Sequence, residues 1–212
     1  MSECTSPIPH LFIEEFFTEY ELDQLIFPEL EYLTSPVRLH PQIMTNDAEV
    51  TFCNRNYCTL EELFKDARQS DIVNCVDKIY TKKTVSALES INPAFRGFSN
   101  CGTQITTVNY YDNGCYINEH VDGVAWALIV NVYKEPKQFS GGEIEFNDKD
   151  YTRKLEHNQA ILFPASLLNS ITPVLIDNDV PYSGNGLYQI VRFFWIHVDH
   201  DLGTYYGLEP QT

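Results

Sequence analysis

Short apolar runs separated by turn residues fill the second half of the chain, in the pattern that β-strands produce. Residues 103–111 and 126–133 are rich in β-branched and aromatic side chains, which suit a pleated, buried surface. Gly, Asn, Asp and Pro lie between these runs and mark the turns. Further strands are expected at residues 115–122, 141–146, 153–156, 159–163, 169–175 and 186–198. Short strands at this regular spacing predict a sandwich or a barrel.

The first hundred residues follow a different pattern, in which apolar side chains recur at helical spacing. After a short strand at residues 11–13, Thr18 and Glu21 have the spacing of a capping box, which begins a helix that continues to residue 33. Pro28 is expected to break or kink this helix, because proline has no backbone N–H.

Two further helical stretches are expected before the strands begin. Residues 59–62 form a second capping-box pattern and open a helix over residues 60–68. Residues 70–92 keep an apolar face at helical spacing, which predicts a helix packed against a sheet. Residues 35–58 have no convincing period, and we expect a loop there, with a short strand at residues 50–52.

This order of elements places the chain in the α+β class, with a mainly β core. A double-stranded β-helix, the cupin-like jelly roll, accounts for the strands, and the N-terminal helices are expected to pack on one of its sheets. The length of 212 residues suits a single domain, residues 1–212. Within it, residues 1–100 are expected to form a support region of strand and helices, and residues 101–200 the β-helix core.

Charge and cysteine content limit the classes of partner. The net charge is −16, from 30 acidic and 14 basic residues, so we expect no nucleic-acid partner, because phosphate contacts need clustered Lys and Arg. The sequence has no apolar run that could span a bilayer and no pattern of a secretory signal, so no membrane partner is expected. The six cysteines are scattered without a C-x-x-C pair, which favours reduced thiols and a cytoplasmic location.

His120 and Asp122 are the first candidates for chemistry. On a strand, residues two apart share a face, so an imidazole nitrogen and a carboxylate oxygen project side by side. Such a pair suits a divalent first-row metal, iron(II) among them. Alone, a His-x-Asp pair is a weak signal, and the surrounding residues decide how much weight it carries.

The surrounding residues do add weight to the pair. The motif residues follow one another in the order Tyr111, Gly114, His120, Asp122, Gly141-Gly142-Glu143, Phe163-Pro164 and Thr172-Pro173-Val174. With these residues, over about positions 102–197, the chain resembles the iron(II)/2-oxoglutarate-dependent oxygenases, in particular their prolyl-hydroxylase-like branch. The resemblance implies a jelly-roll fold, iron(II) as cofactor and 2-oxoglutarate as cosubstrate, with Tyr111 lining the cosubstrate pocket.

Two positions depart from the pattern of that family. The resemblance implies a histidine as third metal ligand, where this chain has Asn169, whose neutral oxygen is a weaker donor for iron. It also implies a basic residue on the last strand that pairs with the far carboxylate of 2-oxoglutarate, at the position of Gln189, or of Tyr188 if the register slips by one. Arg192, the only arginine on that strand, lies on the face opposite to Gln189, and it could bind the anion only in a different register.

Two functional hypotheses from different classes follow. The first is an oxygenase in which His120, Asp122 and Asn169 hold iron(II), and which hydroxylates an amino-acid side chain of prolyl type or a related small substrate, free or in a peptide. The second is a catalytically degenerate jelly-roll module for binding or assembly, which has lost the complete metal and 2-oxoglutarate site. A narrower alternative is an active enzyme with another cosubstrate or metal. The other histidines considered as third ligand are His157, His197 and His200.

Overall fold

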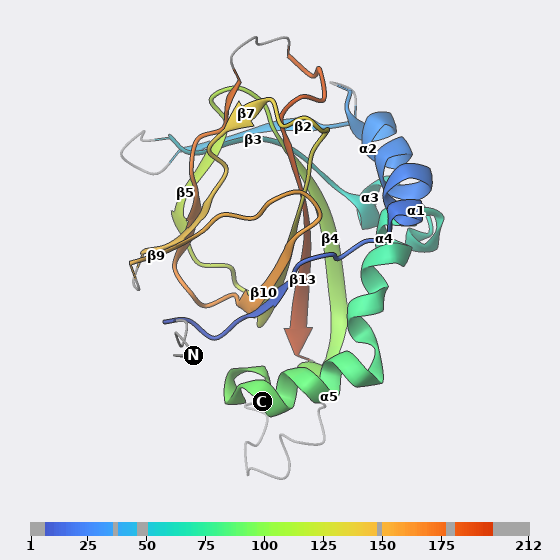
Figure 1. Cartoon of the computed structure of the whole chain (residues 1–212), viewed down its shortest axis with the longest axis vertical. Helices are drawn as coiled ribbons and strands as arrows, with labels where there is room; N and C mark the ends of the chain where they lie inside the picture. The colour runs from blue at the N-terminus through green and yellow to red at the C-terminus, as the bar shows by residue number, and fades with distance from the viewer. Residues whose placement is uncertain (1–6, 36–37, 46–50, 148–149, 177–180, 197–212) are drawn as a thin grey trace, which may run out of the picture.

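The computed structural model describes residues 7–35, 38–45, 51–147, 150–176 and 181–196. In this part of the chain the strands curl into a half-barrel, and the helices lie along one outer side of it (Figure 1). The strands are β1 (Leu11–Ile13), β2 (His40–Thr45), β3 (Thr51–Thr59), β4 (Cys101–Tyr111), β5 (Tyr116–His120), β6 (Trp126–Val132), β7 (Phe139–Ser140), β8 (Ile144–Phe146), β9 (Tyr151–Arg153), β10 (Ala160–Pro164), β11 (Asn169–Ile171), β12 (Leu175–Ile176) and β13 (Leu187–Ile196). The α-helices are α1 (Glu19–Glu21), α2 (Phe27–Leu33), α3 (Leu60–Leu63), α4 (Asp71–Val76) and α5 (Lys82–Ile91).

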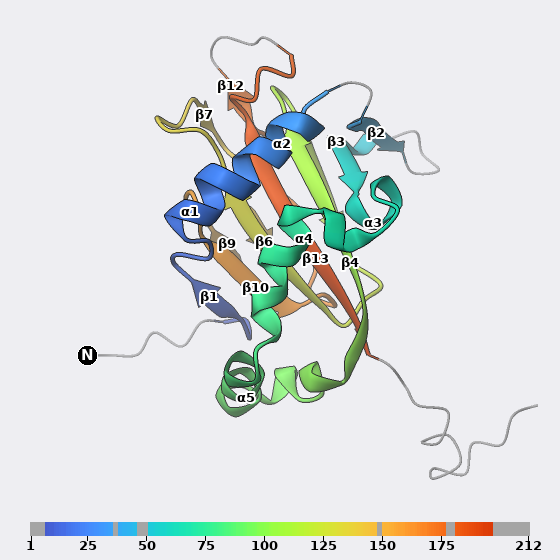
Figure 2. The same ribbon diagram turned by 90° about the vertical axis from the view of Figure 1, so that its right-hand side faces the viewer.

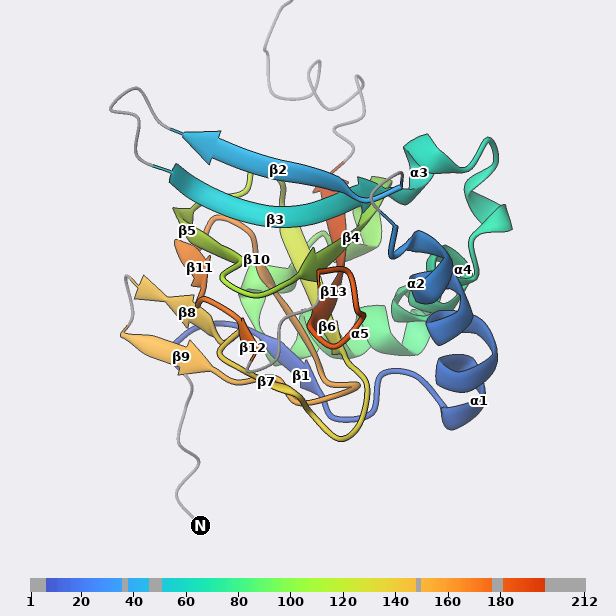
Figure 3. The ribbon, with the colours of Figure 1, turned by 90° about the horizontal axis from the view of Figure 1, so that it is seen from above.

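One antiparallel sheet of eleven strands dominates the described residues. Its order is β1-β10-β6-β13-β4-β3-β5-β11-β8-β9, with β2 beside β3, while β7 and β12 pair separately. Seen from above, the strands surround a common interior, and β2 and β3 lie across one side of it (Figure 3). This is the curled sheet of a double-stranded β-helix, so the predicted jelly roll with helices packed on one sheet is confirmed.

Strand β6 illustrates why the sequence of the central strands is almost continuously apolar. Leu128 and Val130 belong to the core beneath the helices, whereas Ala127 and Ile129 belong to a second core inside the barrel. Successive side chains of a strand point to opposite faces, so a strand buried on both faces shows no apolar–polar alternation, and in β6 only Asn131 is polar. All seven residues of β6 are buried accordingly.

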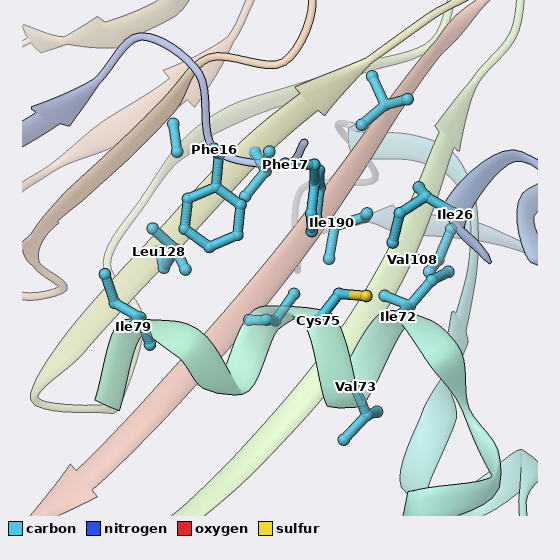
Figure 4. Packing of buried hydrophobic residues seen from close by; sticks show 14 of the residues in the cluster. Phe16, Phe17, Ile26, Ile72, Val73, Cys75, Ile79, Val108, Leu128 and Ile190 are labelled. Carbon is cyan, nitrogen blue, oxygen red and sulfur yellow. The ribbon is translucent and has the colours of Figure 1, made fainter. Parts of the chain in front are cut away.

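The helices cover the outer face of β6, β13 and β4, where α1, α2 and α4 lie in front of these strands (Figure 2). The core between the two layers is apolar and close-packed, and it gives this side of the sheet its stability. Figure 4 shows the side chains that meet there. Ile72 and Cys75 come from α4, Ile79 from the turn after it, Val108, Leu128 and Ile190 from the strands, and Phe16 and Phe17 from the segment before α1.

The first helix continues through Pro28, where a break or kink was expected. The capping box of Thr18 and Glu21 is present, as predicted. A π-helical turn over Leu22–Ile26 follows it, in which the N–H of Phe27 bonds to the carbonyl of Leu22. Pro28 then lies in the first turn of α2, where its missing N–H costs little.

The prediction of a loop at residues 35–58 is wrong. Most of this segment forms the antiparallel hairpin β2–β3, and β3 pairs on its other edge with β4 and β5. The first hundred residues therefore supply three strands, β1, β2 and β3, to the same sheet as the core. Strand β3 is difficult to recognise from the sequence, because polar side chains such as Asn54 and Asn56 interrupt the alternation of apolar and polar residues.

The two later helical stretches are shorter than expected. The helix predicted over residues 60–68 ends at Leu63, and Thr59 makes no side-chain cap at its start. The stretch 70–92 is divided into α4, a 3₁₀ turn at Asp77–Tyr80, and α5, which is capped by Thr81. Within the described residues, none of the helices has both the length and the apolar character to span a bilayer.

The glycine pair Gly141-Gly142 is explained by packing rather than by chemistry. A Cβ on Gly141 would lie 1.9 Å from the carbonyl oxygen of Pro173, and one on Gly142 would lie 2.6 Å from a methyl of Leu187. Both glycines have positive φ, of 80° and 78°. The Gly-Gly and Thr-Pro-Val motifs therefore fit each other, and they belong to the construction of the fold.

Candidate functional site

A cavity of about 260 Å³ lies inside the barrel, on the face of the sheet away from the helices. Strands β3, β4, β5, β6, β11 and β13 contribute to its walls, together with the segment that follows β5. Its lining consists of Cys53, Arg55, Asn109, Tyr111, Ile117, His120, Val121, Asp122, Ala127, Ile129, Asn169, Ile171, Gln189, Val191 and Phe193. Five of the six site residues expected from the sequence are in this set, and Arg192 is not.

His120 is the last residue of β5, and Asp122 follows two positions later. The His120 Nε2 and Asp122 Oδ1 atoms are 3.7 Å apart, close enough for both to reach one metal ion. The His120 Nδ1 lies 3.0 Å from the carbonyl oxygen of Asn118, to which it can only donate. This hydrogen bond orients the ring and leaves the lone pair on Nε2, the nitrogen that faces Asp122.

Asn169 begins β11 directly opposite His120 in the antiparallel ladder. Its side chain is 2% exposed. The amide nitrogen donates to the carbonyls of Leu167, at 3.1 Å, and of His120, at 3.4 Å. The Asn169 Oδ1 is therefore the side-chain atom that could act as a metal ligand.

These side chains fit a divalent first-row metal, with one imidazole nitrogen, one carboxylate oxygen and one amide oxygen as donors. Among the described residues, no three His, Cys, Asp or Glu side chains are grouped to hold a metal, so Asn169 is the third donor that the cavity offers. His157 lies outside the cavity, where its Nδ1 accepts from the N–H of Tyr133 and its ring stacks on Phe27. The remaining alternatives, His197 and His200, lie outside the described residues.

Burial shapes the electrostatics of the cavity. Removal from water raises the pKa of Asp122, while the nearby charges of His120 and Arg55 oppose this shift. Burial also raises the pKa of the Tyr111 hydroxyl, again against the charge of Arg55. The positive charge of Arg55 thus opposes the rise in pKa of both Asp122 and Tyr111.

The floor of the cavity carries buried polar atoms that have no hydrogen-bond partner within the described residues. They are Asn109 Oδ1, Tyr111 Oη and Gln189 Nε2. Asn109 and Gln189 lie opposite each other on β4 and β13, and each of the three side chains is at most 1% exposed. Native proteins pair almost all buried polar groups, so such a cluster indicates a place for a polar ligand or water.

Arg192 is placed on the other face of β13, and the suggestion that it binds the cosubstrate is wrong. Its guanidinium donates to Asp77 Oδ1 at 2.5 Å, to Thr106 Oγ1 at 2.7 Å and to Gln104 Oε1 at 3.0 Å. The period of two along β13 turns Gln189 inward and Arg192 toward the helices, as counted from the sequence. Gln189 is thus the residue of the last strand that faces the cavity at the expected position.

Arg55 is a cavity residue that the sequence reasoning missed. It lies in β3, within the segment expected to be a loop, and it is the only Lys or Arg in the lining of the cavity. The alternation of Cys53, Arg55 and Tyr57 with polar neighbours was the one available signal, and it is too weak to predict a strand.

The fold resembles solved structures of iron-dependent oxygenases, although sequence identity to them is low. A prolyl-4-hydroxylase from Pseudomonas putida superimposes with a TM-score of 0.56 at 10% identity, covering 90% of this chain and 94% of that one. A viral collagen prolyl hydroxylase from Paramecium bursaria Chlorella virus-1, solved in complex with 2OG, gives 0.54 at 18% identity, with 88% and 94% covered. A 2OG-Fe(II) oxygenase-family protein from Burkholderia pseudomallei gives 0.55 at 13% identity, with 89% and 86% covered.

No family model and no curated protein matches the chain. The structural likeness therefore establishes the fold, which this chain shares with the two prolyl hydroxylases and with the 2OG-Fe(II) oxygenase-family protein. What the cavity binds and does must be argued from its own residues.

Proposed function

We propose that this chain is a non-haem iron(II) oxygenase that uses 2-oxoglutarate as cosubstrate and hydroxylates an amino-acid side chain of prolyl type or a related small substrate. The observation that carries the proposal is the meeting of His120, Asp122 and Asn169 at one cavity of this fold. The substrate class, a small molecule or a peptide, follows from the resemblance and from the size of the cavity. The strongly acidic chain argues against nucleic acid as a partner.

Each residue has a distinct part in this proposal. His120 Nε2, Asp122 and Asn169 Oδ1 would hold the metal and leave its other positions open. When bound, iron(II) and 2-oxoglutarate together supply the oxidation, in which 2-oxoglutarate is converted to succinate as oxygen is consumed. The apolar walls formed by Ile129 and Val191 exclude water from the reacting centre.

The first experiment is anaerobic reconstitution with iron(II), with and without 2-oxoglutarate, followed by an assay for succinate after air is admitted. The proposal expects metal binding near one ion per chain and succinate formation that depends on both components. Succinate forms even without the natural substrate when turnover is uncoupled, so the assay does not require the substrate to be known.

Variants at two ligand positions test the assignment of the metal site. Asp122→Ala should remove iron binding while thermal unfolding stays close to that of the wild type, because the carboxylate is the only charged ligand. Iron binding that is unchanged in this variant would contradict the assignment. Asn169→His should raise iron affinity, because imidazole is a stronger donor to iron than a neutral amide.

A non-catalytic binding module is the second candidate, and one observation favours it. Both Asn169 and Gln189, the two departures from the family pattern, face the cavity, so neither is compensated by a simple shift of register. Under this alternative, reconstitution would give neither iron binding nor succinate, and Asn169→His would restore the metal but not turnover.

A further inference from the structure

Arg55 reaches the cavity from the centre of β3, which also contributes Cys53 to the lining, and all other lining residues lie beyond position 108. The strand is held on one edge by the pairs Asn56–Tyr110 and Cys53–Ile117, which join it to β4 and β5. The pair Asn56–Tyr110 places Arg55 and Tyr111 one residue further along their strands, and both side chains line the cavity. The hairpin thus fixes the guanidinium beside the tyrosine by backbone pairing rather than by a mobile loop.

The Arg55 guanidinium is oriented but not neutralised by the protein. Its Nε donates to Gln42 Oε1 at 2.8 Å, and Gln42 is its cross-strand partner on β2. No ion pair involves Arg55 among the described residues, although the chain contains 30 acidic residues. With Nε engaged, the two terminal nitrogens remain as a fork for a planar anion such as a carboxylate.

The neighbours of Arg55 add further donors at the same place. The Gln189 Nε2 is buried and has no hydrogen-bond partner within the described residues, and the buried Tyr111 hydroxyl lies close to Arg55. Both can donate to an oxygen. A guanidinium, a phenol and an amide N–H around one cavity form a set of donors that a carboxylate would satisfy, and an apolar ligand would leave unpaired.

We propose that Arg55, assisted by Tyr111, binds the carboxylate of the cosubstrate that lies remote from the metal. The inference rests on the proposed function and deepens it. The charge that the last strand lacks at Gln189 is supplied from β3, on the opposite side of β4. Gln42 acts as a positioning residue, because its Oε1 accepts from the Nε of Arg55 and its side chain is not part of the cavity lining.

A simpler role for Arg55 would be to balance the charge of Asp122, and the two roles differ in what they affect. If Arg55 only balanced the charge of Asp122, its loss would change the affinity for metal and would affect 2-oxoglutarate and 2-oxobutanoate equally. Carboxylate binding would change affinity for 2-oxoglutarate and leave affinity unaltered for 2-oxobutanoate, which has no second carboxylate.

The test measures binding by calorimetry to protein loaded with manganese(II), a redox-inactive substitute for iron. We expect the wild type to bind 2-oxoglutarate more tightly than 2-oxobutanoate, and Arg55→Gln to lose about 10- to 100-fold in affinity for 2-oxoglutarate alone. Manganese affinity should change by less than about threefold. Arg68→Gln is the matched control, because Arg68 is exposed and paired with Asp66 on the outer surface.

Two more variants keep the inference testable if Arg55→Gln folds poorly. Tyr111→Phe removes only the hydroxyl and should weaken 2-oxoglutarate binding by about 3- to 10-fold without loss of thermal stability. Gln189→Arg in the Arg55→Gln background returns a cation to the cavity from the last strand. It should recover most of the lost affinity, which a merely structural role of Arg55 would not allow.

The outcomes separate this inference from the function on which it rests. Equal 2-oxoglutarate binding by the wild type and Arg55→Gln would overturn the inference alone. A parallel loss of manganese would overturn it in favour of charge balance. A wild type that takes up manganese but no 2-oxoglutarate would overturn both the inference and the proposed cosubstrate.

Discussion

The buried polar residues on the two faces of strand β13 differ in whether they have hydrogen-bond partners. Arg192, on the face beneath the helices, is 5% exposed and has partners on β4 and on the turn after α4. Gln189, on the face inside the barrel, is 1% exposed, and its Nε2 has no partner among the described residues. Both residues are deeply buried, so burial alone does not explain the difference.

The same contrast extends over the neighbouring strands. On the helix side, Tyr188 is bonded to Thr34, and Tyr110 accepts from the N–H groups of Gly184 and Gly186. The partnerless buried atoms of the three central strands, β4, β6 and β13, all lie on the inner face. They belong to Thr107, Asn109, Tyr111, Asn131 and Gln189.

The comparison indicates that the two faces of one sheet have different functions. Each buried polar group without a partner costs about 1–3 kcal/mol, so five on one face represent stability given up there. Among the described residues, no such partnerless atom lies on the helix side of these strands, where the packing serves only to stabilise the fold. Three of the five residues, Asn109, Tyr111 and Gln189, line the cavity, where their polar atoms can meet a ligand, as active sites allow at the expense of stability.

The largest effect should follow from removing the central group of the helix side. Arg192→Ala leaves Thr106 and Gln104 without their donor and opens a space in the core, so the free energy of unfolding should fall by about 2–5 kcal/mol. Urea unfolding followed by circular dichroism measures this change. Metal binding by the fraction that stays folded should be unaltered, and a stable Arg192→Ala protein would break the comparison.

A matched pair of substitutions gives the next largest effect and the most direct test. Gln104→Leu, on the helix side, deprives Arg192 of an acceptor and should cost about 1–3 kcal/mol. Gln189→Leu, on the inner face, removes an atom that has no partner, so stability should be unchanged or raised by about 1 kcal/mol. The two proteins can be compared in one urea series, and equal losses would refute the division between the faces.

The smallest effect concerns Glu29, a buried carboxylate of the helix side, which accepts from Ser70 Oγ at 2.7 Å and from the N–H of Ile72 at 2.9 Å. Burial nevertheless raises the pKa of Glu29. The folded state then holds this proton to higher pH than the unfolded state, so stability falls as pH rises from the usual carboxyl pKa to the raised one.

Glu29→Gln should abolish this part of the pH dependence, because the amide does not titrate. The measurement is the difference in unfolding free energy between the wild type and the variant across mildly acidic pH. The wild type should lose stability relative to the variant as pH rises through that window. The opposite slope would mean that the two donors outweigh burial and hold the carboxylate ionised.

Much of the site could be predicted because it depends on local periods. His120 and Asp122 are two residues apart, and their nearness follows from the short path between them. The opposite orientations of Gln189 and Arg192 follow from the period of two along one strand. The apolar β6, buried on both faces, was likewise evident from its composition.

The sequence by itself thus determined the class of fold, the motif residues and the face on which each lies, since these are set by neighbours along the chain. The short strand expected at residues 50–52 overlaps the start of β3, but only the tertiary structure decided that the strand continues to Thr59, because its hydrogen bonds come from β2, β4 and β5. The same pairing brings Arg55 to the cavity beside Tyr111, and the pairing of β5 with β11 brings Asn169 opposite His120. Such contacts between distant segments leave no period in the sequence, so the charge that completes the cavity emerged only from the folded chain.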